Sequence, residues 1–177
     1  QYSSEYFDAE IYRDGFRYNL HFEKGQNIGG LQKEPTNRKQ TGSRQRWKPD
    51  LEVFTDVDIP VEFYENVLKR QAVVNPGLLF VFRNETESGM ETKEFIYEKG
   101  IVDYVAELAG ENALTSIQYW EDEQRGRDRE DKDEYKVKLS VAFCFSNQVN
   151  LAEYYHNSSF LEYGGSPDRA VKMAFTY

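Results

Sequence analysis

The sequence is organised around one stretch, Gln40-Thr41-Gly42-Ser43-Arg44-Gln45-Arg46-Trp47-Lys48-Pro49-Asp50. A turn of small residues opens the stretch, and small residues let a ligand or another backbone come close. The alternating run that follows predicts a strand, which Pro49 ends because proline cannot donate a hydrogen bond to a ladder. Any strand that is entered through a glycine turn looks similar, so this pattern alone indicates no function.

Composition excludes several classes of protein. The 177-residue chain has 31 acidic and 22 basic residues and a net charge of −9, which argues against a stand-alone nucleic-acid binder and for weak binding to duplex DNA. One cysteine excludes an internal disulfide, and two histidines argue against a zinc site. No apolar run is long enough to span a membrane and no signal peptide is visible, so we expect a cytoplasmic protein with no membrane partner.

A β-hairpin is expected before this stretch. The turn is Arg13-Asp14-Gly15, a strong hairpin signal, and the alternating strands cover residues 6–12 and 16–22. Residues 25–40 are rich in glycine and basic side chains, and we expect an exposed loop there.

A helix and two further strands are expected after the stretch. Pro60 starts a helix over residues 61–73, and Asn75-Pro76-Gly77 ends it. The run Leu78-Leu79-Phe80-Val81-Phe82 is apolar on both faces, which favours a central strand, and an edge strand follows through residues 95–97. This order predicts an α+β fold with a mostly antiparallel sheet and a helix on one face.

A second unit is expected from Gly100 onward. A helix covers residues 101–109 and stops at Gly110, and a strand covers residues 115–121. Residues 121–134 are almost wholly charged, which is typical of a solvated hairpin tip. The clearest strand follows over residues 135–145, and we expect residues 150–156 to pair back to it. A final helix begins with Ser166 as N-cap and Pro167 as its first residue, and its pattern runs to Tyr177. Because the chain begins at Gln1 and ends within this pattern, we expect it to be a piece of a longer protein.

Residue chemistry alone does not resolve a function. The sequence has no phosphate loop, dinucleotide fingerprint or nucleophile elbow. His21 and His156 are typical of surface or strand-end histidines, and Cys144 is typical of a small packed residue. The carboxylates lie in charge runs rather than in apolar settings that would shift their pKa values.

The order of the motifs nevertheless resembles the ATPase region of bacterial type IIA topoisomerase B subunits, the DNA gyrase and topoisomerase IV family. The resemblance is carried by segments in the family's order and at about its spacing. These are Arg13-Asp14-Gly15, Thr41-Gly42-Ser43 with Trp47-Lys48-Pro49-Asp50 and Phe54, Lys69-Arg70 with Val74-Asn75-Pro76-Gly77-Leu78, residues 97–105, and Glu162-Tyr163-Gly164-Gly165.

The resemblance implies a domain division and a nucleotide site. Residues 1–99 would be the C-terminal half of a nucleotide-binding domain of the GHKL class (gyrase, Hsp90, histidine kinase, MutL). Residues 100–177 would be the start of a transducer domain that is similar to the second domain of ribosomal protein S5. Ser43 would bind adenine through water, next to Thr41 and Gly42, and Arg13 would lie at the rim of the nucleotide pocket, where coumarin inhibitors reach. The cofactors implied for the intact protein are ATP and Mg²⁺, and the partners are DNA, the topoisomerase A subunit and a second copy of the ATPase region.

Departures from the family's pattern indicate a diverged paralogue and do not distinguish gyrase from topoisomerase IV. Ser43 stands where the family has threonine, Ser166-Pro167 replaces Thr-His, and the charged insert at 121–134 is longer than expected. The family's catalytic glutamate and Mg²⁺-binding asparagine would precede Gln1, so we expect this chain alone to be inactive and to hold no metal or cofactor. The alternatives are a non-catalytic acidic interaction module and another GHKL ATPase such as a MutL-like repair protein.

Overall fold

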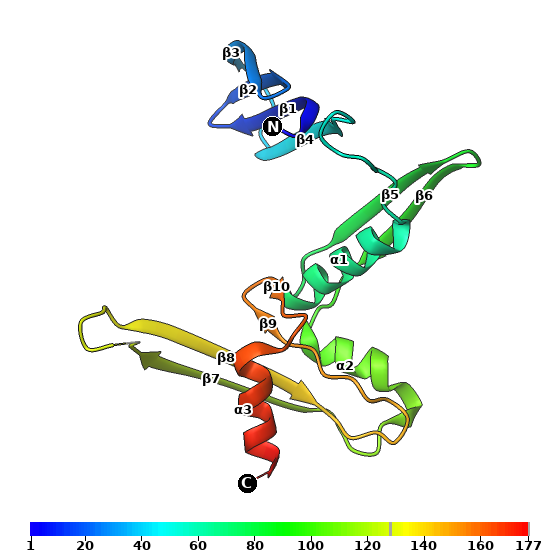
Figure 1. The fold of residues 1–177 in the computed structure, drawn as a ribbon, viewed down its shortest axis with the longest axis vertical. Helices are drawn as coiled ribbons and strands as arrows, with labels where there is room; N and C mark the ends of the chain where they lie inside the picture. The colour runs from blue at the N-terminus through cyan, green and yellow to red at the C-terminus, as the bar shows by residue number, and fades with distance from the viewer. Residues whose placement is uncertain (128, 177) are drawn as a thin grey trace. The chain divides into compact units, whose positions relative to one another are not determined.

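The computed structural model describes residues 1–127 and 129–176, and the chain forms two compact units, Gln1–Ile59 and Pro60–Tyr177 (Figure 1). Antiparallel strands and a few helices make up the fold, so the prediction of an α+β protein is confirmed. In the part of the chain that the structure describes, no helix has both the length and the apolar character needed to cross a bilayer.

The first unit is a four-stranded antiparallel sheet in the order β3-β2-β1-β4. Its strands are β1 (Ser4–Arg13), β2 (Phe16–Glu23), β3 (Gln26–Pro35) and β4 (Gly42–Pro49). The expected hairpin at Asp14-Gly15 is confirmed, and both turn residues have positive φ angles of 54° and 76°. This is the turn geometry that matches the twist of two paired strands.

The expected loop over residues 25–40 is wrong, because β3 occupies most of it. Lys24 and Gly25 have φ angles of 44° and 84°, so they form a second tight turn that folds the chain back onto β2. The register of β3 shifts between Asn19 and His21 of β2, opposite the positive-φ pair Gly29-Gly30. Every residue of β3 is exposed, so the strand lacks the apolar alternation by which strands are recognised.

The second unit begins with α1 (Val61–Val74), which packs on the hairpin of β5 (Phe80–Thr86) and β6 (Gly89–Phe95). The helix and its end at Asn75 are as predicted. The expected central strand is wrong: among the described residues β5 pairs only with β6, and Leu78 and Leu79 precede it with 51% and 46% of their surfaces exposed. The apolar run therefore marks the approach to β5 rather than a strand buried on both faces.

A small core forms where α1 ends and α2 (Ile101–Ala109) begins. Ala72, Val73 and Tyr97 are buried at its centre, and the partly buried residues around them are Val74, Phe80, Phe95, Ile101 and Tyr104. Gly100 precedes α2 with a φ angle of 56°, and Gly110 ends it and opens a 3₁₀ turn, η1 (Gly110–Asn112). Both bounds of this helix are as predicted.

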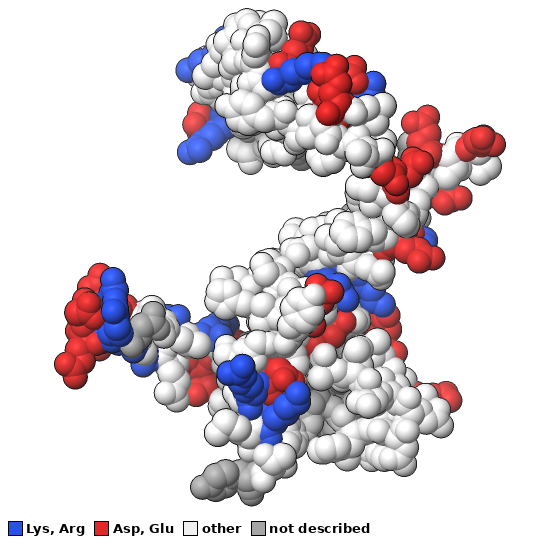
Figure 2. Space-filling model, in the orientation of Figure 1, with Lys and Arg blue, Asp and Glu red and all other residues white. Residues whose placement is uncertain are grey.

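The charged segment forms the end of a long two-stranded hairpin, β7 (Gln118–Gly126) and β8 (Tyr135–Phe143). Figure 2 shows side chains of both signs gathered at its tip. Lys136 pairs with Glu123 at 2.7 Å, and Lys138 pairs with Glu121 at 2.6 Å. The predicted solvated tip is confirmed for the described residues, and Asp128 of this segment lies outside them.

The chain after β8 differs from the prediction in its pairing. Residues 150–156 do not return to β8; Tyr155–His156 (β9) instead pairs with Ser159–Phe160 (β10) through a turn in which Asn157 has a φ angle of 53°. The last helix, α3 (Gly165–Thr176), begins one residue before Ser166, so Ser166 is inside the helix rather than its N-cap. Phe175 of α3 packs edge-on against Phe143 and Phe145. Tyr177 lies outside the described residues.

Candidate functional site

The residues predicted to bind a nucleotide lie at one end of the four-stranded sheet. Arg13 is the last residue of β1, and Thr41 immediately precedes β4. Ser43 faces Ile11 across the antiparallel pair of β1 and β4, and Gly42 faces Tyr12. Facing residues share a side of a sheet and successive residues alternate, so Ser43, Ile11 and Arg13 lie on the same face.

This shared face is largely apolar and open. Phe7 of β1 contacts Phe22 of β2 edge to face, with their ring centroids 6.2 Å apart. Ile11 and Trp47 on the same face expose 40% and 54% of their surfaces. An apolar surface bordered by a hydroxyl and a guanidinium can take a flat, partly polar ring, since ligand sites combine apolar area with a few oriented polar groups.

Arg13 extends into solvent at the turn. Its Nε lies 3.2 Å from Oδ2 of Asp14, and 75% of each side chain is exposed. An ion pair this exposed contributes little to stability, so the guanidinium can exchange Asp14 for another partner at low cost. The geometry therefore suits a residue at the rim of a site.

Gly42 has space for a side chain, so no close contact with a neighbouring group in the described part of the chain requires glycine at this position. A Cβ atom added there would come no nearer to another group than 3.8 Å, from Nη2 of Arg38, among the described residues. The guanidinium of Arg38 also lies 4.1 Å from the centroid of the Tyr12 ring, on the face opposite Ser43. The structure thus places Arg13 and Ser43 on one face of the sheet, whereas Gly42 shares the register of Tyr12 on the other face. The roles of Ser43, Thr41, Gly42 and Arg13 in nucleotide binding stay predictions.

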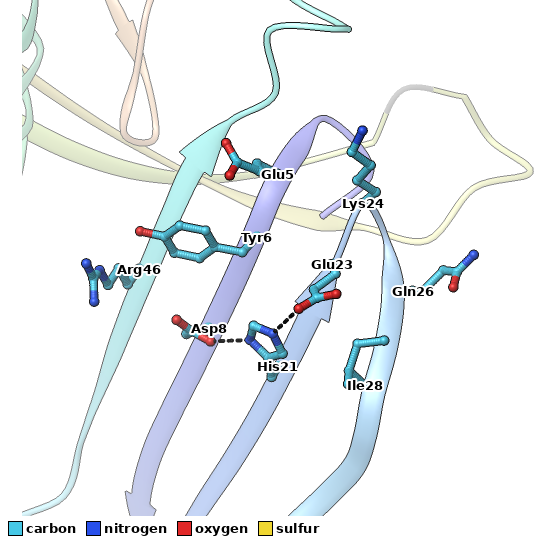
Figure 3. A pocket seen from close by; sticks show the side chains of 9 residues that line it. All are labelled: Glu5, Tyr6, Asp8, His21, Glu23, Lys24, Gln26, Ile28 and Arg46. Carbon is cyan, nitrogen blue, oxygen red and sulfur yellow. Dashed lines mark hydrogen bonds and ion pairs between the residues drawn. The ribbon is translucent and has the colours of Figure 1, made fainter.

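The opposite, polar face of the sheet holds a cluster that the sequence did not reveal. Nδ1 of His21 lies 2.6 Å from Oδ1 of Asp8, and its Nε2 lies 3.3 Å from Oε1 of Glu23 (Figure 3). These side chains line an open hollow together with Glu5, Tyr6, Lys24, Gln26, Ile28 and Arg46. The hydrogen bond to Asp8 raises the pKa of His21 most, and the hydrogen bond to Glu23 raises it further.

A signal for this cluster was present in the hairpin turn. The turn at Asp14-Gly15 places Arg13 opposite Phe16, and counting back along both strands places Asp8 opposite His21. Glu10 and Arg17 meet on the same face, where the Arg17 guanidinium lowers the pKa of Glu10. Within residues 1–127 and 129–176, no group of three or more histidine, cysteine, aspartate or glutamate side chains is arranged to hold a metal ion.

Comparison with known proteins places the chain in a wider context. No protein-family model matches it. The chain is 25% identical over 174 residues to the B subunit of DNA gyrase from Thermotoga maritima, and 28% identical over 175 residues to that of DNA topoisomerase 4 from Enterococcus faecalis. Each alignment covers 98% of this chain but only 27% and 24% of the relative, so the chain spans about a quarter of these proteins' lengths.

Solved structures agree with the sequence relatives in fold. The 43K ATPase domain of Thermus thermophilus gyrase B, solved with an aminocoumarin, superposes with a TM-score of 0.68 at 22% identity, over 98% of this chain and 49% of that one. The topoisomerase IV ATP-binding domain of Francisella tularensis gives a TM-score of 0.54 at 25% identity over 69% of this chain and 36% of that one. The chain is therefore a homologue of the B subunits of DNA gyrase and topoisomerase IV and shares the fold of the gyrase B ATPase domain, as the order of its motifs predicts.

Proposed function

We propose that this chain is part of an ATP-dependent type IIA DNA topoisomerase, from the component that couples ATP binding and hydrolysis to DNA strand passage. The observation that carries the proposal is the alignment of 98% of the chain with B subunits of both gyrase and topoisomerase IV. The agreement in fold with a gyrase B ATPase domain supports it. A non-catalytic acidic module would not be expected to match both.

In this proposal the chain is divided as the family resemblance implies. Residues 1–99 complete a GHKL nucleotide-binding domain, and residues 100–177 begin the transducer. Ser43, Thr41 and Gly42 border the adenine site, and Arg13 lies at its rim. The shared face of Ser43 and Arg13, next to exposed Ile11, supports this assignment. The intact protein uses ATP with Mg²⁺ and works with DNA, the topoisomerase A subunit and a second copy of itself.

The family resemblance identifies no residue of this chain with the family's catalytic base or metal ligand. The present chain contributes the wall of the site rather than the reacting groups, because hydrolysis needs a positioned base and a metal ligand. We therefore expect the isolated chain not to hydrolyse ATP.

The test of the proposal uses the complete protein that contains this chain, mixed with its A subunit. Supercoiling, relaxation or decatenation of closed circular DNA is measured with ATP and Mg²⁺ and without ATP. The proposal expects strand passage that depends on ATP. Strand passage that is unaffected by omitting ATP, or no strand passage under any of these conditions, would overturn it.

A further inference from the structure

Two consecutive residues near the end of α1 each pair with a carboxylate of a different segment. Nζ of Lys69 lies 2.5 Å from Oε1 of Glu107 on α2. Nη2 of Arg70 lies 3.8 Å from Oε1 of Glu153, which precedes β9. The Glu153 side chain is only 13% exposed, so its charge is far less screened by solvent than a surface charge.

Tyrosine hydroxyls hold both carboxylates in place. Tyr97 donates a hydrogen bond of 2.6 Å to Oε2 of Glu107, and Tyr155 donates one of 2.6 Å to Oε2 of Glu153. Burial raises the pKa of each tyrosine, and the hydrogen bond to the neighbouring glutamate raises it further. Both tyrosines therefore remain donors at neutral pH. Burial opposes the ionisation of Glu107, but hydrogen bonds from Lys69 and Tyr97 outweigh it and lower its pKa. Each pair is thus a charge-assisted network rather than a lone surface contact.

A third contact attaches the β9–β10 hairpin to the same turn of α1. Nε2 of Gln71 donates a hydrogen bond of 2.8 Å to the carbonyl of Ser158. The Arg70 guanidinium lies 3.7 Å from the ring centroid of Phe160. Figure 1 shows β9 and β10 beside the end of α1. We call Lys69, Arg70 and Gln71, with their partners Glu107, Glu153 and Ser158, the α1 latch.

We infer that the α1 latch is a positioning device that carries movement of the nucleotide-binding half into the transducer. The inference rests on the proposed function, in which α1 belongs to the nucleotide-binding domain (1–99) and α2 with β9–β10 to the transducer (100–177). Every contact of the latch crosses that division. Coupling between distant sites travels through packed and hydrogen-bonded groups of this kind, and neither Lys69 nor Arg70 needs to touch the nucleotide.

The core beside the latch makes α1 a suitable transmitting element. Val73 of α1 packs with Tyr97 in the buried cluster, and Ile101 and Tyr104 of α2 pack against it. The Tyr97 and Tyr104 rings meet edge to face with their centroids 5.8 Å apart. Apolar packing sets the distance between α1 and α2. The latch fixes the orientation of α1 relative to α2 and to the β9–β10 hairpin, because ionic and hydrogen bonds are directional. Removing a latch contact should therefore loosen the coupling without dissolving the core.

The experiment measures strand-passage cycles per ATP hydrolysed by the complete protein with its A subunit. Arg70→Ala and Glu153→Gln should each lower this ratio by about two- to thirtyfold, the range that matches measured coupling energies. Lys93→Ala is the matched control: Lys93 pairs with Glu65 of α1 at 2.6 Å, but both residues lie within the nucleotide-binding half. The control should keep the wild-type ratio. The charge swap Lys69→Glu with Glu107→Lys should recover more of the ratio than Lys69→Glu alone.

The ratio separates coupling from simple loss of folded protein, because unfolding lowers hydrolysis and strand passage together. Should Arg70→Ala fail to fold, Tyr155→Phe removes only one hydroxyl and decides the question in its place. The latch would be overturned if the wild-type enzyme is active and the ratio stays at the wild-type value both in Glu153→Gln and in Arg70→Ala (or in Tyr155→Phe, where Arg70→Ala does not fold). The proposed function would then remain intact. A wild-type protein without ATP-dependent strand passage would overturn the proposed function, and the latch with it.

Discussion

Nδ1 of His21 lies 2.6 Å from Oδ1 of Asp8, directly across the β1–β2 pair. On its other side the ring meets Glu23 of the same strand, and Ile28 faces it from β3. Arg46 of β4 faces Asp8 across the β1–β4 pair, and its guanidinium lies 5.6 Å from the centroid of the Tyr6 ring. Two carboxylates against one histidine favour the imidazolium, which is why the pKa of His21 is raised.

The first prediction is that this histidine makes stability depend on pH. A raised folded-state pKa adds stability that is complete below the unfolded value of 6.5 and is lost as the pH rises through the folded-state pKa. We therefore expect Tm to fall as the pH rises from about 6.5, and His21→Asn to flatten this part of the profile. The measurement is Tm against pH by circular dichroism. A His21→Asn profile parallel to wild type would contradict the expectation.

The second prediction concerns Gly100, which adopts φ 56° and ψ −123°, next to Pro76. A Cβ atom there would lie 2.8 Å from Cγ of Pro76 and 3.0 Å from the carbonyl oxygen of Val73. Gly100→Ala should cost about 1–3 kcal/mol in backbone strain and about 1–3 kcal/mol more in overpacking. Chemical denaturation measures this free energy.

Gly110 is the matched control for that substitution. It adopts a similar backbone conformation, φ 49° and ψ −133°, but a Cβ atom would meet nothing within 4 Å among the described residues. Gly110→Ala should therefore lose only the strain energy. Equal losses at the two glycines would show that the contact with Pro76 and Val73 costs nothing.

The third prediction tests whether the small core stabilises the second unit. Val73 is 1% exposed and Val67, on the same helix, is 40% exposed. Val73→Ala should reduce the free energy of unfolding by about 1.5–3 kcal/mol, and Val67→Ala by clearly less, since buried apolar area sets the cost. Urea unfolding of both variants checks the difference. Similar midpoints for the two variants would mean that the core lies elsewhere.

The sequence predicts the elements of this chain that depend on local chemistry. The tight turn at Asp14-Gly15 and the helix over 101–109 follow from turn and stop residues that act within a few positions. The helix α1 follows from its apolar stripe and its flanking Pro60 and Asn75. Such signals do not require the identity of any distant partner.

The elements that were predicted wrongly depend on partners far along the chain. The strand β3 is exposed throughout, so no apolar alternation distinguishes it from a loop, and the turn at Lys24-Gly25 was its only local sign. Tyr154 and Tyr155 have a high propensity for strands, but β9 pairs with β10 rather than with β8. Local patterns indicate that a strand can form, whereas its pairing is decided by tertiary packing.

The candidate site likewise combines residues that the sequence predicts with contacts that only the tertiary structure reveals. Arg13 and Ser43 come from motifs, and only the sheet register shows that they share a face. The cluster of His21, Asp8 and Glu23 comes from that register and from no motif. The α1 latch was equally hidden, because Glu153 lies far from Arg70 in the sequence.

The central claim is that Ser43 borders the adenine site of an ATP-binding protein. If its hydroxyl holds the base through water, Ser43→Ala in the complete protein removes one net hydrogen bond worth roughly 0.5–1.5 kcal/mol. Ser43→Thr keeps the hydroxyl and suits a strand, so it should bind ATP at least as well as the wild type. Arg13→Ala should leave ATP affinity nearly unchanged and weaken a coumarin-type inhibitor, as expected of a residue at the rim.

Calorimetric titration of ATP into the complete protein and its Ser43→Ala variant is the most direct measurement, with Tm as the control for folding. We predict a roughly two- to tenfold loss of affinity in the variant at an unchanged Tm. Wild-type affinity in Ser43→Ala, or a loss that only accompanies a lower Tm, would contradict the adenine role of Ser43.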